Sequence, residues 1–136
     1  TNLTMKQLLA LYLMSNTKEP FIINRLKSIK YAFLGMLRLI KTEASIQIQF
    51  VIAIIVTVAG FYYSISNTEW IMQCFAIGMV MSIEGLNTAV EEVANFIHPN
   101  HHPKIGIIKD VAAGAVFIAS IAASIIGLII YIPKIF

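Results

Sequence analysis

The sequence has 136 residues, of which 58% are hydrophobic and 12% are charged, and its formal net charge is +3. Soluble domains carry about twice that share of charged residues, so the composition excludes an ordinary soluble domain and favours a membrane protein of one domain. The single cysteine, Cys74, excludes an intramolecular disulfide and a metal site built from several thiolates.

Residues 1–20 are predicted to form an N-terminal extension that precedes a membrane domain over residues 21–136. The extension contains a short apolar run, Met5–Met14, but no small-residue cleavage pattern follows it. A charged pair and a proline come next instead. We therefore expect a short amphipathic or poorly ordered extension rather than a signal peptide.

Residues 21–43 are predicted to form an amphipathic helix on the membrane surface. At about 100° per residue, its basic side chains fall in one sector and its apolar side chains fall opposite. The basic residues are Lys27, Lys30, Arg38 and Lys41. Such a helix suits an anionic membrane surface. Arg25 and Glu43 project toward the apolar side, which indicates a role other than lipid binding.

Three further segments are predicted to be transmembrane helices, because a helix needs about 20 apolar residues to cross a bilayer. They are residues 46–65, 70–95 and 108–132. The second segment ends in a polar stretch, and the third is rich in small residues that permit close helix packing. Each span should be helical, because lipid cannot hydrogen bond to an open backbone.

Lysine and arginine are distributed unevenly, which predicts the orientation of the spans. Seven of the ten basic residues precede residue 46, and the loop before the third span holds Lys104 and Lys109. The turn at Ser64–Glu69 has no basic residue. We therefore expect the N-terminal helix and the second loop to face the cytoplasm.

The placement of the acidic residues is the strongest functional signal in the sequence. Polar residues recur at i, i+3, i+4, i+7 and i+11 within the second span, so they share about 100° of one helix face. This carboxylate stripe comprises Glu84, Asn87, Thr88, Glu91 and Asn95. A hydrogen-bonded seam between helices is the alternative. Two like charges near lipid, however, need a cation or protons to neutralise them. This favours a functional site over a purely structural seam.

Carboxylates and basic groups at a membrane surface indicate a site that handles phosphate. Mg²⁺ prefers a few carboxylates plus phosphate oxygens, and Glu91 with Glu43 could hold such an ion. Glu84 lies about 10 Å deeper by helical rise, where it would suit proton removal from a lipid hydroxyl. Arg25 and Lys109 are basic groups at similar depth. The sequence has no glycine-rich phosphate loop, so helix side chains must hold any nucleotide.

The loop between the second and third spans contains three histidines, His98, His101 and His102. A zinc site is one interpretation, but the loop has no cysteine and the ligand spacing is irregular. Contact of His101 or His102 with a nucleotide is the favoured interpretation. A simple polar loop is the remaining alternative.

Two stretches, EGLNTAVEEVANFI and HHPKIGIIKDVAAGAV, resemble the signature of the prokaryotic diacylglycerol kinase family, which includes undecaprenol kinases. With RLKSIKYAFLGMLRLIKTE, the resemblance covers about residues 24–132. It implies an all-α integral membrane fold of three transmembrane helices plus an N-terminal amphipathic surface helix. It also implies a homotrimer in the bacterial inner membrane, with active sites between subunits at the cytoplasmic face.

The resemblance implies transfer of the γ-phosphate of ATP, with Mg²⁺, to a membrane lipid alcohol, and no nucleic-acid partner. By position, Glu84 is the proton acceptor, and Glu43 and Glu91 bind the metal. The residues implied to bind the nucleotide are Arg25, Tyr31, Asn87, His101, His102, Lys109 and Asp110.

Several residues depart from the family pattern. Asn95 stands where the family usually has aspartate, and His101 replaces a common tyrosine. Gln47 and Gln49 stand where charged residues often follow the metal-binding Glu43. The signature does not separate undecaprenol from diacylglycerol as the substrate, although the His-Pro pair after the stripe favours undecaprenol.

A small oligomeric transporter or a proton-pathway subunit is the alternative from another functional class, since intramembrane glutamates fit that as well. A transport path should place polar groups through the whole depth of the bilayer. The outer halves of the three predicted spans are nearly free of charge, which favours chemistry at the cytoplasmic surface.

Overall fold

The computed structural model describes residues 5–6, 20–100 and 102–136, and within these ranges it contains four helices and no strand. The helices are α2 (Phe21–Thr42), α3 (Ala44–Tyr62), α4 (Asn67–Ile97) and α5 (Pro103–Ile135). The prediction of an all-α chain is confirmed. The predicted extension over residues 1–20 falls almost wholly outside the described residues.

The chain divides into two compact units, residues 1–37 and residues 38–136. Most of α2 belongs to the first unit. This helix coincides, to within a residue at its end, with the predicted surface helix, and none of its residues is buried. Near its start, the Arg25 guanidinium lies 5.2 Å from the centre of the Phe21 ring. A helix with no buried face needs another surface to pack on.

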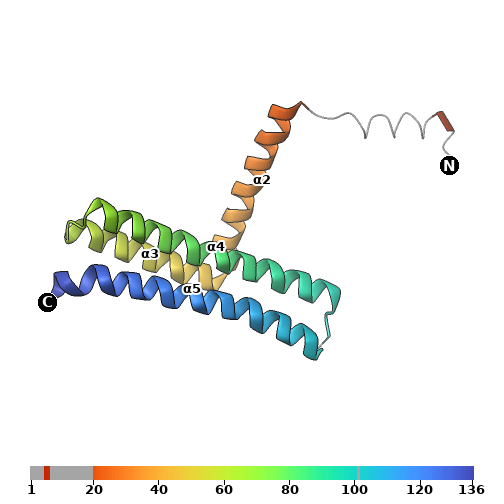
Figure 1. Ribbon diagram of the computed structural model, residues 1–136. Helices are drawn as coiled ribbons and strands as arrows, with labels where there is room; N and C mark the ends of the chain where they lie inside the picture. Colours follow the sequence, from red (N-terminus) through yellow and green to blue (C-terminus); the bar gives the residue numbers. More distant parts are fainter. Residues whose placement is uncertain (1–4, 7–19, 101) are drawn as a thin grey trace. The chain divides into compact units, whose positions relative to one another are not determined.

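The second unit consists of the last turn of α2 and three long helices that lie side by side, as Figure 1 shows. α4 packs against α3 and, more extensively, against α5. We call the end where α3 turns into α4 the turn end, and the C-terminus of α5 lies there as well. We call the opposite end, where residues 98–102 connect α4 to α5, the loop end.

In the part of the chain that the structure describes, α3 and α5 are the helices long and apolar enough to cross a membrane. The second predicted span, residues 70–95, lies in α4, which has 31 residues but does not meet the same criterion. The physical reason is its C-terminal half, where the carboxylate stripe interrupts the apolar run. The crossing of the membrane by α4 therefore stays a prediction.

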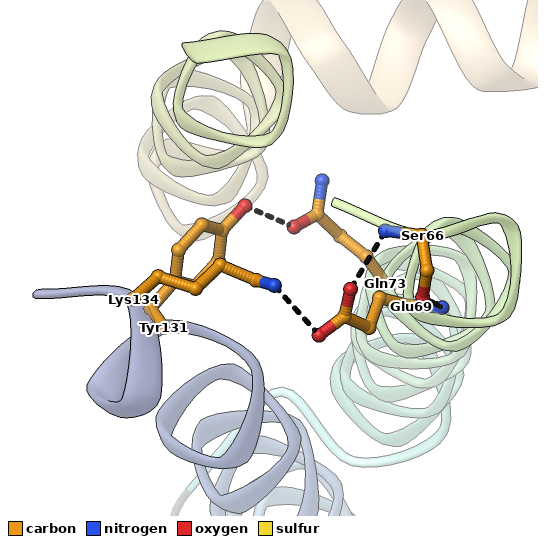
Figure 2. Close-up of polar contacts among 5 residues, drawn as sticks. All are labelled: Ser66, Glu69, Gln73, Tyr131 and Lys134. Atoms are coloured by element: carbon orange, nitrogen blue, oxygen red, sulfur yellow. Dashed lines mark hydrogen bonds and ion pairs between the residues drawn. The ribbon is translucent and has the colours of Figure 1, made fainter. Parts of the chain in front are cut away.

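A capping box begins α4 at the turn end (Figure 2). The Ser66 hydroxyl accepts a hydrogen bond from the Glu69 N–H, and the Glu69 carboxylate accepts one from the Ser66 N–H at 2.7 Å. Lys134 from α5 lies 3.1 Å from the same carboxylate. The bonds from Ser66 lower the pKa of Glu69. The cap therefore loses its stabilising charge only as the pH falls through that lowered value.

Tyr131 joins α5 to both other helices at the turn end. Its hydroxyl lies 2.6 Å from Gln73 Oε1 and 2.7 Å from the Val56 carbonyl oxygen, to which Gln73 Nε2 also donates. Gln73 is 5% exposed, so its amide is a buried polar group whose nitrogen and oxygen both have partners. Figure 2 shows this pair beside the capping box.

Gly60 permits a close approach of α3 to α4 near the turn end. A Cβ atom at this position would lie 2.7 Å from Trp70 Cη2 and 3.1 Å from Ile65 Cδ1. The Trp70 ring also packs on Phe61, with ring centroids 4.9 Å apart. The indole therefore occupies the space that any side chain at residue 60 would need.

We expect Gly60→Ala to destabilise the helical unit by roughly 1–3 kcal/mol, because the added methyl group must displace the packed Trp70 ring. Thermal unfolding of the purified protein in detergent would measure the effect. Gly78→Ala is the matched control, since a Cβ at Gly78 meets nothing within 4 Å. Equal unfolding midpoints for both variants would show that the ring does not constrain this position.

Candidate active site

α4 runs without a break through the carboxylate stripe, so the five stripe residues share one face of a single helix. Glu84 also continues the row of buried α4 residues that starts at Gln73 and passes through Ala76 and Val80. It is only 8% exposed. The stripe therefore begins with a carboxyl group inside the helical unit and extends from there toward the loop end.

The opposite face of α4 is apolar at the loop end. Together with Ile105 and Ile108 of α5, its side chains line a groove; they are Leu86, Ala89, Val90, Val93, Ala94 and Ile97. This face gives α4 an apolar surface toward the start of α5. The polar stripe lies on the other side of α4 from these apolar side chains, although Asn95 at its end still reaches Lys109 of α5.

Asn87 and Glu91 form the polar centre of the stripe. Asn87 Nδ2 donates a hydrogen bond to Glu91 Oε1 at 3.0 Å, whereas Asn87 Oδ1 is buried and has no hydrogen-bond partner among the described residues. Buried polar atoms usually have partners. An unpaired oxygen beside a carboxylate is a combination that suits a hard cation such as Mg²⁺, which takes oxygen ligands.

Lys109 connects the start of α5 to the end of the stripe. Its ammonium group donates to Asn95 Oδ1 at 2.7 Å. Because this acceptor is a neutral amide, the bond holds Lys109 in place without cancelling its positive charge. Asp110 follows on the same helix and is exposed. A cation is thereby fixed at the loop end, where a phosphate group could meet it.

His102 has a structural role at the beginning of α5. Its Nδ1 accepts a hydrogen bond from the Lys104 N–H at 3.2 Å and caps the helix, which leaves Nε2 for any ligand. Its ring centroid lies 5.1 Å from that of His98. His101 lies outside the described residues. Within the described ranges, no three His, Cys, Asp or Glu side chains form a metal-binding group, so the zinc interpretation gains no support.

Glu43 lies at the junction of α2 and α3, in extended backbone just before α3. The Thr42 hydroxyl donates to its Oε1 at 3.3 Å. Nearby, Leu39 packs on α4, since a Cβ at Gly85 would lie 3.1 Å from its Cδ1. Glu43 thus bonds to Thr42, and Glu91 bonds to Asn87 of its own helix. A metal ion shared by the two glutamates stays a prediction.

Arg25 and Tyr31, which were predicted to bind the nucleotide, lie on α2 in the first unit. Tyr31 is 68% exposed and Arg25 is exposed as well. Both side chains are accessible to a ligand, and their roles stay predictions.

Sequence reasoning missed one polar residue of α3. Gln49 Oε1 is buried and, like Asn87 Oδ1, has no partner among the described residues. The signal was available, because Gln49 is a polar residue inside an apolar run of a predicted span. It was interpreted only as a departure from the family pattern.

Comparison with known proteins identifies the family. The family model described as prokaryotic diacylglycerol kinase matches residues 30–131, which includes the carboxylate stripe, Glu43 and the Lys109–Asp110 pair. This chain belongs to the prokaryotic diacylglycerol kinase family. The match begins after Arg25, so the proposed role of that residue has no support from it.

Three relatives agree with this assignment. The undecaprenol kinase of Bacillus subtilis is 38% identical over 108 residues, which cover 79% of this chain and 88% of the relative. The diacylglycerol kinase of Synechocystis is 32% identical over 111 residues, which cover 81% of this chain and 63% of that relative. The diacylglycerol kinase of Haemophilus influenzae is 30% identical over 102 residues, which cover 75% of this chain and 86% of that relative. Family and relatives confirm the prediction of a membrane-bound lipid kinase, and they give the transporter interpretation no support.

We expect Asn87→Leu to weaken binding of a divalent cation by at least ~10-fold, because it removes the unpaired oxygen beside Glu91. Titration of the protein with Mn²⁺, followed by electron paramagnetic resonance, would measure this. Thr88→Val is the matched control on the same stripe, since the Thr88 hydroxyl is bonded to the Glu84 carbonyl oxygen. Unchanged Mn²⁺ affinity in Asn87→Leu would remove Asn87 from the metal site.

Proposed function

We propose that this chain transfers the γ-phosphate of ATP, with Mg²⁺, to a membrane lipid alcohol, and that undecaprenol is preferred over diacylglycerol. The observation that carries the proposal is the arrangement at the loop end. A buried carboxyl group, an unpaired amide oxygen beside a second carboxylate, and a fixed ammonium group occur along one helix and its neighbour. Phosphoryl transfer relies mainly on such positioning and charge neutralisation.

Glu84 is the proposed general base. Its carboxyl group lies at the deep end of the stripe, so it can meet the hydroxyl of an alcohol that stays in the bilayer. It would accept the hydroxyl proton as the oxygen attacks the γ-phosphate. Removing a general base typically lowers the reaction rate by a factor of roughly 10² to 10⁴.

The phosphate groups are assigned to the part of the stripe nearer the loop end. Glu91 and Glu43 are the proposed metal ligands. Asn87, predicted from the sequence to bind the nucleotide, would also offer its Oδ1 to Mg²⁺. When bound, Mg²⁺ neutralises charge on the phosphate oxygens. Lys109 would contact a phosphate directly, and Asp110 would order the groups around it.

The nucleotide itself is assigned to four further side chains. Arg25 and Tyr31 from α2, together with His101 and His102 from the loop, are the proposed contacts. For His102, the helix cap leaves Nε2 to make such a contact.

We further propose that α3, α4 and α5 all cross the bacterial inner membrane, with α2 on its cytoplasmic surface. The domain would then comprise residues 21–136. The distribution of lysine and arginine supports this orientation. A homotrimer with shared sites is proposed as well. Large apolar side chains exposed along all three helices support contact with lipid or with other copies of the chain.

The preference for undecaprenol has two supports. The relative named undecaprenol kinase is more similar to this chain than the two diacylglycerol kinases are, at 38% against 32% and 30% identity. The His102–Pro103 pair after the stripe points the same way.

We expect Glu84→Gln to lower lipid phosphorylation by about 10² to 10⁴, because an amide cannot accept the hydroxyl proton. Transfer of label from γ-labelled ATP to lipid, measured by thin-layer chromatography, gives the rate. Glu92→Gln is the matched control, since Glu92 is an exposed glutamate of the same helix that lies off the stripe. Near-normal activity in Glu84→Gln, with membrane insertion intact, would refute the assigned base.

We expect purified protein in lipid nanodiscs to phosphorylate undecaprenol with a higher kcat/KM than diacylglycerol. The same labelled-ATP assay, with each lipid at equal mole fraction, measures both values. Omitting Mg²⁺ should stop both reactions. Label in diacylglycerol alone would contradict the preference while leaving the lipid kinase assignment in place.

A further inference from the structure

The three helices of the second unit line a partly open cavity of about 280 Å³ that the proposed site does not include. Its lining is mostly apolar and comes from residues 49–56 of α3, 73–81 of α4 and 120–131 of α5. On α5, small residues create the space, since Ser120, Ala123, Ser124 and Gly127 recur at helical spacing along the wall. The α5 wall is about 16 Å long by helical rise.

The cavity is closed by protein hydrogen bonds at the turn end. Tyr131, Gln73 and Val56 all line it there, and their polar groups bond to one another. Figure 2 shows the bond between Tyr131 and Gln73. Because these polar groups are already paired, that end offers no strong attraction for a polar ligand.

The other end of the cavity lies next to the proposed base. Met81 is the last α4 residue of the lining, and Glu84 follows three residues later, about 4.5 Å further along the helix. Gln49 is the first α3 residue of the lining, and its buried Oε1 has no partner among the described residues. This end therefore combines an unpaired hydrogen-bond acceptor with a neighbouring carboxyl group.

We propose that this cavity binds the hydrocarbon chain of the lipid alcohol, with its hydroxyl group at the Gln49 end. This inference rests on the proposed kinase function and assigns the substrate's apolar part to named residues. The hydroxyl has one proton, which it can donate to Gln49 Oε1, an acceptor without a donor among the described residues, or turn toward Glu84, which lies about one helical turn beyond Met81. The hydrocarbon chain of the lipid then extends along α5 toward Tyr131.

The volume fits the first part of such a chain. An apolar cavity of about 150 Å³ in a protein core stays free of water and holds benzene, so 280 Å³ accommodates about ten carbon atoms. A longer chain must leave the cavity beyond that length. The unpaired acceptor at one end, among the described residues, and the apolar wall match a molecule with one hydroxyl followed by hydrocarbon.

Photolabelling in nanodiscs tests the placement of the chain without ATP. The probes are two 16-carbon primary alcohols, one with a diazirine near carbon 2 and one with a diazirine near carbon 10. We expect the first to label the peptides with Gln49 and Met81, and the second to label those with Gln73 and Tyr131. Labelling spread evenly over outward residues such as Phe117 and Ile118, 68% and 70% exposed, would overturn the proposal.

Filling the cavity provides the second measurement. A Cβ at Gly127 meets nothing within 4 Å, so Gly127→Leu should enter the cavity and reduce labelling of its lining at least ~5-fold. Gly78→Leu is the matched control, because Gly78 is equally open but lies outside the lining. Ala123→Leu serves if Gly127→Leu does not fold. Equal labelling in the filled variant and the control contradicts the proposal.

The remaining outcomes separate this inference from the kinase function. Phosphorylation of lipid by the unlabelled wild-type protein, with labelling outside the cavity, refutes the inference and retains the function. Cavity labelling with no phosphorylation of any lipid alcohol refutes the kinase function. It also refutes the assignment of the bound hydrocarbon chain to a substrate. A disulfide between two copies of Ala123→Cys shows that a second copy fills the space, which also refutes the proposal.

Discussion

The structure depends on one constraint, which is that polar groups in an apolar helical unit must find partners. α4 carries such groups at both of its ends, and the two ends meet the constraint differently. At the turn end, Glu69, Gln73, Lys134 and Tyr131 bond to other protein groups (Figure 2). At the loop end, Asn87 Oδ1 has no partner among the described residues. Paired groups stabilise the fold, whereas an unpaired acceptor is free to bind.

The chemistry of the unpaired atoms suggests what they bind. Asn87 Oδ1 and Gln49 Oε1 are both acceptors, and Asn87 lies beside a carboxylate. Acceptors without donors attract metal cations and hydroxyl groups rather than anions. Phosphate would be repelled there unless a cation intervenes, which is the condition that the proposed Mg²⁺ and Lys109 would satisfy. A site poor in donors within reach of a bilayer thus favours an alcohol and a metal–phosphate complex as its two reactants.

The sequence predicted the helices and the stripe well, because both follow from periodicity along one chain. An unbroken α4 places residues 84 to 95 as the spacing required. Contacts between segments far apart in the sequence were not predictable. The bond from Lys109 to Asn95 and the cavity between α3 and α5 depend on how helices pack, which side-chain spacing does not encode. Gln49 was therefore interpreted only as a departure from the family pattern, although its buried Oε1 is an acceptor at the cavity between the helices.

Depth along α4 links these features into one order. Glu91 lies toward the loop end, Glu84 lies two turns deeper, and Gln49 marks the start of the cavity beyond. In the proposed mechanism, water-soluble ATP would approach from the first position and the lipid from the last. The proposed base between them would meet both reactants without either leaving its own phase. The interrupted apolar run of α4, which lowers the hydropathy of that helix, would thus separate the two approaches.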